Sequence, residues 1–373
     1  MNFARTDKSA VAQWWWSVDR WTLLALAALV GFGSLLVMAA SPSVAERIGA
    51  DHLHFVKRYF AVLPAALAVM FAVSLQTPRN VRRIAIAGFA LAVALMIATM
   101  FIGVEIKGAR RWIELPWFSL QPSEFVKPCF AVLSAWLFAK SRDTPGFPGQ
   151  AIAVGLFLLV LFLLIRQPDF GMAFVVSAVW FTQFFLAGLR LAWAAACLGT
   201  GGLGLIAAYF TLPHVQSRID RFLDPASGDS YQIDRSMDAF MNGGLFGRGP
   251  GEGTAKDTLP DAHADFVFAV AGEELGLIAC LVIVVLFAFI VLRGFSRLLQ
   301  ENNLFIVIAA TGLFVQFGLQ AVINMASALH LMPTKGMTLP FISYGGSSTI
   351  ALALGMGMVL ALTRKRYGQE SLA

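Results

Sequence analysis

The chain has 373 residues, of which 58% are hydrophobic and 13% are charged, and it carries a net charge of +6. Soluble domains average roughly 45–50% apolar and 25% charged residues, so this composition excludes a soluble globular protein and predicts a polytopic membrane protein. Because the apolar runs follow each other with short connections, we expect one integral membrane domain over residues 1–373.

Ten apolar runs are long enough to cross the hydrocarbon core of a bilayer, which predicts an all-α fold of about ten transmembrane helices. The first run begins at Trp21 and is too long for the apolar region of a signal peptide, so we expect it to be retained. The expected spans are residues 21–40, 59–75, 84–104, 124–139, 151–166, 170–188, 191–212, 266–292, 304–326 and 347–363.

Ten crossings place both termini on one side of the membrane. Basic residues flank nearly every short loop on that side, and they include Arg79, Arg82, Arg83, Lys140, Arg142, Arg293 and Arg297. By the positive-inside rule we place the termini in the cytoplasm, with cytoplasmic tails at residues 1–20 and 364–373. The tryptophans at positions 14–16 and Trp21 favour an anchor at the membrane interface.

The three cysteines, Cys129, Cys197 and Cys280, all lie inside apolar stretches. Their number is odd and their spacing fits no metal site. The sequence therefore predicts neither a disulfide framework nor a zinc site.

Polar residues cluster around the start of the fourth span. Residues 107–112, Lys-Gly-Ala-Arg-Arg-Trp, lead to Gln121-Pro-Ser-Glu124 and then to Lys127. Glu124 and Lys127 share one helix face at i, i+3. An ammonium group inside a span is expected to face the bundle or a wet cavity and to pair with an acidic group, for which Glu124 is the nearest candidate. A purely structural ion pair is the alternative.

Two further segments precede spans on the outer face. Asp169, in Gln167-Pro-Asp-Phe-Gly171, is predicted to cap the sixth span. The segment from Asn324 to Ser348 is broken by proline and glycine before the tenth span. Irregular backbone at membrane depth survives only against protein or a water-filled cavity, so we expect this segment to line the same cavity as Lys127.

The longest loop, residues 213–264, is expected to be extracytoplasmic. Its mixture of apolar and charged residues favours short amphipathic helices on the membrane surface. Residues 243–253 contain six glycines in eleven positions. Two interpretations stay open for them: backbone that approaches a ligand closely, or a flexible linker. A nucleotide-binding P-loop is excluded, because the Gly-Lys-Ser/Thr ending is absent.

The stretch Leu259–Gly276 places two aspartates, His263 and two glutamates at the start of the eighth span. Charge at a membrane boundary is costly and usually functional. Asp265 immediately precedes the span and could serve as a helix cap or as a general base. Glu273 and Glu274 point about 100° apart on a helix, so at most one is expected to line the cavity.

Six of these segments together resemble the signatures of the SEDS family (shape, elongation, division and sporulation), which includes FtsW, RodA and SpoVE. They are residues 107–112, 121–127, 167–171, 231–244, 259–276 and 339–348. Pro333-Thr-Lys335-Gly336 is more similar to the cell-division branch, FtsW, than to the elongation branch. One departure is Ala264, where many members have threonine, and it leaves the neighbouring carboxylate in place.

The resemblance implies a peptidoglycan glycosyltransferase of the bacterial cytoplasmic membrane, acting at the division septum. Its substrate would be lipid II, a membrane-anchored disaccharide-pentapeptide, polymerised into glycan strands at the outer face. The family's essential aspartate falls on Asp265, which would act as general base on the acceptor 4-hydroxyl. The leaving group is a lipid pyrophosphate, a stable anion, so cations are needed more than a second acid.

The resemblance also implies a set of residues that bind the substrate or its pyrophosphate. They are Lys107, Arg111, Trp112, Gln121, Ser123, Glu124, Lys127, Lys256, His263, Ser343 and Tyr344. A divalent cation, Mg²⁺ or Mn²⁺, could assist the lysines and the arginine, but its ligands are unknown, and no other cofactor is expected. His263 either assists proton transfer or hydrogen-bonds within the loop. Trp112 either stacks on a sugar or anchors the chain at the interface.

The partners implied are lipid II, a class B penicillin-binding transpeptidase with one span, other division proteins and the membrane, with no nucleic acid. Two other functions stay open. A lipid II flippase would be favoured by inverted repeats, but we find no convincing repeat and the polar residues crowd onto one face. A non-enzymatic division scaffold would leave the charged pocket without a purpose.

Overall fold

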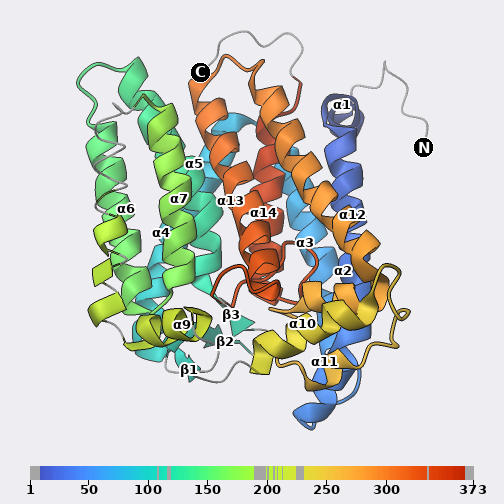
Figure 1. The fold of residues 1–373 in the computed structure, drawn as a ribbon. Helices are drawn as coiled ribbons and strands as arrows, with labels where there is room; N and C mark the ends of the chain where they lie inside the picture. The colour runs from blue at the N-terminus through green and yellow to red at the C-terminus, as the bar shows by residue number, and fades with distance from the viewer. Residues whose placement is uncertain are drawn as a thin grey trace.

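The structure is a computed structural model whose helices form a bundle with their long axes roughly aligned (Figure 1). It describes residues 9–106, 109–115, 119–188, 199, 201–204, 206–207, 209–211, 213–223, 231–333 and 336–365. The long helices are α2 (Arg20–Arg47), α3 (His54–Ser74), α4 (Pro78–Ile102), α5 (Pro122–Asp143), α6 (Gly149–Arg166), α7 (Phe170–Leu186), α12 (Val267–Leu298), α13 (Leu304–Ala328) and α14 (Gly346–Leu362). Shorter helices are α1 (Ala10–Ser17), α9 (Pro213–Leu223), α10 (Tyr231–Gly243) and α11 (Ala255–Thr258).

The helices agree with a polytopic membrane protein. Among the described residues, six helices, α2, α3, α4, α6, α12 and α13, are long and apolar enough to cross a membrane. Helices occupy nine of the ten expected spans, and the other, residues 191–212, lies largely outside the described part of the chain. The number of crossings stays a prediction.

The helices begin where local sequence signals place them. Thr77 caps α4 through its side chain, with Pro78 as the first helical residue. Asp169 caps α7 by accepting a hydrogen bond of 3.2 Å from the Met172 amide, which confirms the predicted cap. Asn303 caps α13 in the same way through the Ile306 amide.

One end of the bundle carries both the first described helix and the last described residues (Figure 1). The Lys365 amide donates to the Ser17 carbonyl at 3.1 Å, and Trp14 packs with Leu360. The opposite end carries α9, α10, α11 and the strands. This arrangement agrees with an even number of crossings, and the orientation in the membrane stays a prediction.

A small antiparallel sheet at that opposite end departs from the predicted all-α class. Its strands are β1 (Val104–Ile106), β2 (Ala109–Glu114) and β3 (Ser119–Leu120), in the order β1-β2-β3. The strands follow the end of α4, where charged residues replace the apolar run. Backbone groups there still need partners, and strand pairing satisfies them over a short connection.

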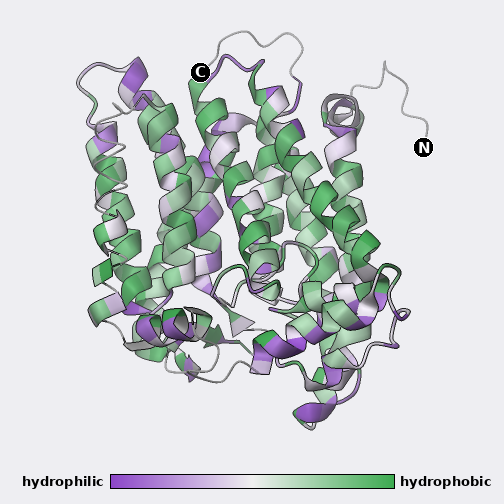
Figure 2. Ribbon diagram, in the orientation of Figure 1, coloured by the Kyte–Doolittle hydropathy of each residue, from purple (hydrophilic) through white to green (hydrophobic). Residues whose placement is uncertain are grey.

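Helix α13 is far more buried than the other five candidate spans: 72% of its apolar window is buried, against 22–39% for the others. Most residues of α5 and α14 are buried as well, so these three helices form the centre of the described bundle. The outer helices present apolar side chains outward, and hydrophilic residues gather towards the two ends (Figure 2). Phe101 and Leu91 on α4 are examples of such exposed apolar residues. An apolar outer surface around a core that contains amides is what a lipid environment requires.

Candidate active site

Asp265 lies in a turn at the start of α12, partly buried. The amides of Ala264 and Asp265 both donate to the Asp261 carbonyl at 3.0 Å. Helix α12 begins at Val267 with Phe266 as its N-cap residue, so Asp265 lies one residue before the capping position. A Cβ added to Gly336 would lie 3.1 Å from Oδ2 of Asp265, so the carboxylate is directly beside this glycine.

Hydrogen bonds from two distant segments hold the backbone around Asp265. The Ser343 hydroxyl donates to the Ala264 carbonyl at 2.5 Å, and the Tyr344 amide donates to the His263 carbonyl at 2.9 Å. Nδ2 of Asn324 on α13 donates to the Asp265 carbonyl at 2.9 Å and to the Met337 carbonyl at 2.6 Å. The turn is therefore fixed between α13 and residues 336–345.

Lys127 on α5 is buried and ion-paired. Its Nζ lies 2.8 Å from Oε2 of Glu124, and the two side chains are 2% and 10% exposed. This confirms that Lys127 faces the bundle and pairs with Glu124. Nζ also donates to Oε1 of Gln320 at 2.9 Å. Lys127 is thus bound to α13 as well as to its own helix.

Gln320 continues this network towards Asp265. Its Nε2 donates to the Thr338 carbonyl at 3.0 Å, and the Thr338 and Ser348 hydroxyls are 2.6 Å apart. Thr338 directly follows Met337. The Met337 carbonyl and the Asp265 carbonyl both accept hydrogen bonds from Nδ2 of Asn324. The Glu124–Lys127 ion pair is therefore linked to the backbone of Asp265 by a set of hydrogen bonds that runs through Gln320, the Met337–Thr338 peptide and Asn324.

Sequence reasoning missed Gln320, Thr338 and Ser348 as members of this network. A signal for the α13 members was available, because Gln316, Gln320 and Asn324 recur every four residues in an apolar helix. Residues at this spacing share one helix face. Amides on one face of a buried helix indicate a polar interior, because buried polar groups need hydrogen-bond partners.

The start of α5 is tied to the start of α14. The Gln121 amide donates to the Ser347 hydroxyl at 3.0 Å, and that hydroxyl donates to the Ser119 carbonyl at 2.8 Å. The Gln121 side chain donates to the Ser123 hydroxyl at 3.2 Å. The structure therefore brings Gln121, Ser123 and Glu124 to the same end of the bundle as Ser347.

Arg111 on β2 braces the sheet against the turn between α6 and α7. Its Nε donates to the Gln167 carbonyl at 2.7 Å and its Nη2 donates to the Pro168 carbonyl. Nη1 lies 3.5 Å from Oδ2 of Asp169. Three of its nitrogens therefore contact residues 167–169, and the neighbouring Trp112 is partly buried on the same strand.

His263 is buried between aromatic rings. Its ring centroid is 4.5 Å from that of Phe55 and 5.1 Å from that of Tyr344. Burial lowers the pKa of His263 to about 4, and the charge of Arg47 acts in the same direction while Asp261 opposes it. The imidazole is therefore neutral at pH 7, which favours packing between the two rings over a role as proton donor.

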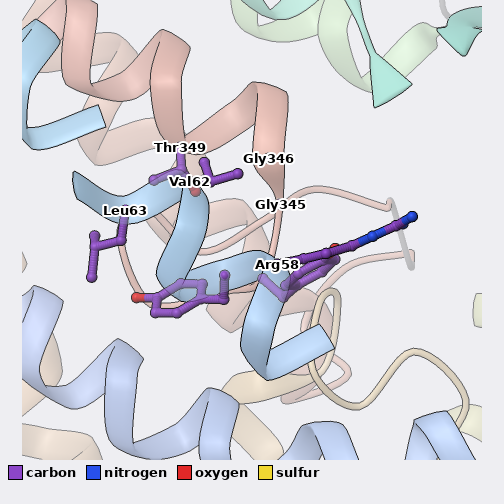
Figure 3. A pocket seen from close by; sticks show the side chains of 8 residues that line it. Arg58, Val62, Leu63, Gly345, Gly346 and Thr349 are labelled. Atoms are coloured by element: carbon purple, nitrogen blue, oxygen red, sulfur yellow. The ribbon is translucent and has the colours of Figure 1, made fainter. Parts of the chain in front are cut away.

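A small hollow lies beside Tyr344, between α3 and the start of α14, with about 190 Å³ of space not occupied by atoms. It is lined by Arg58, Tyr59, Val62, Leu63, Tyr344, Gly345, Gly346 and Thr349. Arg58 extends away from Leu63 at its edge (Figure 3). Part of this space is open solvent, and the hollow itself has room for little more than a water molecule, so it cannot enclose a disaccharide.

Other residues from the sequence analysis lie elsewhere. Lys256 is buried, and its Nζ is 2.7 Å from Oε1 of Glu274. Glu273 and Glu274 are 0% and 1% exposed, and both carboxylates accept hydrogen bonds from loop residues 251–256.

Lys107, Thr334 and Lys335 lie outside the described residues. Within the described chain, no three His, Cys, Asp or Glu side chains gather as metal ligands, so we derive no step through a metal ion.

Comparison with known proteins agrees with this arrangement over nearly the whole chain. Residues 20–368 match the FtsW/RodA/SpoVE family, described as "Cell cycle protein". Two curated relatives are named "Probable peptidoglycan glycosyltransferase FtsW". That of Caulobacter vibrioides is 47% identical, covering 98% of this chain and 94% of its own. That of Trichlorobacter lovleyi is 36% identical, covering 91% and 92%.

Solved structures show the same fold. A chain of a peptidoglycan synthase complex, studied for the coordination of polymerization and crosslinking, superimposes with a TM-score of 0.76 at 28% identity, covering 94% of this chain and 99% of its own. The rod shape determining protein RodA of Thermus thermophilus gives a TM-score of 0.71 at 28% identity, covering 95% and 99%. The chain belongs to the FtsW/RodA/SpoVE family of cell cycle proteins.

Proposed function

We propose that the chain is a peptidoglycan glycosyltransferase of cell division that polymerises lipid II into glycan strands. The observation that carries the proposal is the hydrogen-bonded network between Asp265 and the Lys127–Glu124 pair. It brings a carboxylate and a buried cation to one end of the bundle. The names of the Caulobacter and Trichlorobacter relatives support the same reaction.

Asp265 acts as the general base in this proposal. Its carboxylate accepts the proton of the acceptor's 4-hydroxyl as that oxygen attacks the anomeric carbon of the donor. Single displacement from an α-linked pyrophosphate yields a β-linked product.

Lys127 supplies positive charge to the departing pyrophosphate. Its burial strengthens its electrostatic effect relative to a solvated lysine. Glu124 and Gln320 fix the position of the ammonium before substrate binds. The contacts of Arg111 lead to residues 167–169, and those of Lys256 lead to Glu274 and the Gly251 carbonyl, whereas Lys127 is linked through Gln320 towards Asp265. We therefore assign Lys127, and neither Arg111 nor Lys256, as the principal pyrophosphate cation.

We also propose a location and a partner. Ten crossings with both termini in the cytoplasm would place the Asp265 end of the bundle at the outer face, where lipid II is polymerised. The proposed partner is a class B penicillin-binding transpeptidase, and the likeness to a chain of a complex that coordinates polymerization and crosslinking supports a partner of this kind. The proposed location is the division septum, which the FtsW names of the relatives support.

The direct test is polymerisation of labelled lipid II by the purified protein, with and without the transpeptidase. We expect a ladder of glycan strands on a gel. Reconstituted vesicles that translocate lipid II without forming strands would support the flippase alternative. Protein that neither polymerises nor translocates, but still binds its transpeptidase, would support the scaffold alternative.

A further inference from the structure

Helix α12 is broken near its start, and the glycine-rich loop fills the break. Gly276 has φ 81° and ψ 178°, which interrupts the helix between two regular parts. The amides of Leu277 and Ile278 donate to the carbonyls of residues 244 and 245, at 3.0 and 3.2 Å. The amides of residues 248 and 249 donate to the carbonyls of Glu273 and Glu274, at 2.9 and 3.0 Å. The loop is therefore neither a ligand cradle nor a flexible linker.

Glycine is required where the loop meets the broken helix. Gly247 and Gly276 both have positive φ, at 80° and 81°. A Cβ on Gly276 would collide with the backbone nitrogen of Gly247, and a Cβ on Gly247 would collide with the Glu274 carbonyl. The close approach of the two backbones explains part of the glycine content of residues 243–253.

Two fully buried glutamates continue this attachment along the loop. Glu273 accepts from the amides of Thr254 and Ala255 at 3.1 and 2.9 Å. Glu274 accepts from Nζ of Lys256 at 2.7 Å and from the Gly251 amide at 3.2 Å. We call Lys256, Glu273 and Glu274 the clasp.

The clasp closes the chain segment that carries Asp265. Residues 255 and 256 are joined to residues 273 and 274, and Asp265 lies between these two attachment points. Within the closed segment, Nη2 of Arg47 on α2 donates to the Leu259 carbonyl at 2.8 Å. Release of the clasp would remove the side-chain attachment of residues 251–256 to α12, while the backbone bonds of residues 248 and 249 and the contact at Leu259 remain.

We propose that Lys256, Glu273 and Glu274 are positioning residues that hold Asp265 in register with the network of α13 and residues 336–345. This inference rests on the proposed function, because it assigns to the clasp the alignment of the general base. Hydrogen bonds from specific amides to the two carboxylates are directional, whereas apolar packing is not. Burying these charges is costly, and an apolar contact would hold the loop to the helix with less precision in orientation.

The test compares a single and a double variant. Lys256→Met leaves the Glu274 carboxylate buried without its ammonium partner, so its melting temperature should fall. Lys256→Met/Glu274→Met replaces the pair by apolar side chains of similar volume, so its melting temperature should return towards wild type. The double variant can then be assayed as a folded protein.

In the double variant we expect kcat for lipid II polymerisation to fall about tenfold or more, because small displacements of a catalytic group are costly. KM should stay within roughly a factor of two, since the substrate contacts are unchanged. Arg235→Ala removes an exposed ion pair on α10 and serves as the matched control, with wild-type kinetics. Wild-type kcat in the folded double variant would overturn the inference.

A second measurement does not depend on catalysis. A nitroxide attached at Ala264→Cys, in a chain whose three native cysteines are replaced by alanine, reports the mobility of the turn before Asp265. The clasp predicts a more mobile label in the double variant, and an unchanged spectrum would overturn it. If Asp265→Asn polymerised normally while the label became mobile, the general base would be wrong and the clasp would stand.

Discussion

Two buried lysine–glutamate pairs, one at the start of α5 and one between α11 and the start of α12, look alike in isolation. Nζ of Lys127 is 2.8 Å from Glu124, with side chains 2% and 10% exposed. Nζ of Lys256 is 2.7 Å from Glu274, with side chains 8% and 0% exposed. Burial, charge and distance therefore do not distinguish them.

The difference lies in the remaining hydrogen bonds of each pair. Lys127 donates to the Gln320 side chain, and that network reaches Asp265. Lys256 donates to the Gly251 carbonyl, and Glu274 accepts from the Gly251 amide. The first pair is connected to the candidate general base, Asp265, and the second pair to the backbone of Gly251. The role of a buried ion pair is therefore inferred best from the other groups that hydrogen-bond to its two members.

The largest expected effect comes from a test of membrane topology, which predicts that both lysine–glutamate pairs lie at the outer face. A reporter fused after Ala373 should behave as cytoplasmic. A reporter inserted within residues 224–230, between α9 and α10 and outside the described chain, should behave as external. Reporter activity on the same side for both fusions would remove both pairs from the outer face together.

The second largest effect is expected for Asp265, the candidate general base to which the Lys127 network is linked. Asp265→Asn keeps the size of the side chain but cannot accept a proton. Strand formation from labelled lipid II should fall by about two orders of magnitude or more. The elution profile and melting temperature should match wild type. Near-normal polymerisation in detergent would contradict the assignment of the base.

A smaller loss is expected when the first pair is broken. Lys127→Ala should lower polymerisation about tenfold or more, because it removes a buried cation near the leaving group. Lys127→Arg should retain part of the activity, since the charge remains but its geometry changes. Initial rates with labelled lipid II measure both variants.

A double variant separates the two roles of Lys127. Lys127→Met/Glu124→Gln removes both charges, so its melting temperature should exceed that of Lys127→Ala while its activity stays low. Activity at the wild-type level in this folded variant would make the first pair structural, like the second.

The smallest expected effect belongs to His263, which packs beside the network. Burial lowers its pKa to about 4 from an ordinary 6.5. Below pH 6.5 the unfolded chain gains a proton that the folded chain takes up only near pH 4, so stability should fall as pH drops through this window. The expected loss is on the order of 3 kcal/mol at most. Melting temperatures of wild type and His263→Phe across the window measure it, and parallel curves would contradict it.

The sequence by itself determined the features that depend on residues close to one another along the chain. The apolar runs identified the nine long helices that the structure describes, because a span is defined by consecutive residues. The Asp169 cap and the Glu124–Lys127 pair were predictable because their partners lie three residues away. Six motifs in order were sufficient for the family.

Only the tertiary structure decided which polar groups meet across the bundle. Lys127 and Gln320 are 193 residues apart, and Lys256 on α11 and Glu274 on the first part of α12 are 18 apart. Such contacts depend on how helices pack and where a loop is attached, and spacing along the chain does not encode either in a simple period. For this reason Lys256 could be expected at the pyrophosphate from its charge, whereas its position in the fold gives it Glu274 as a partner.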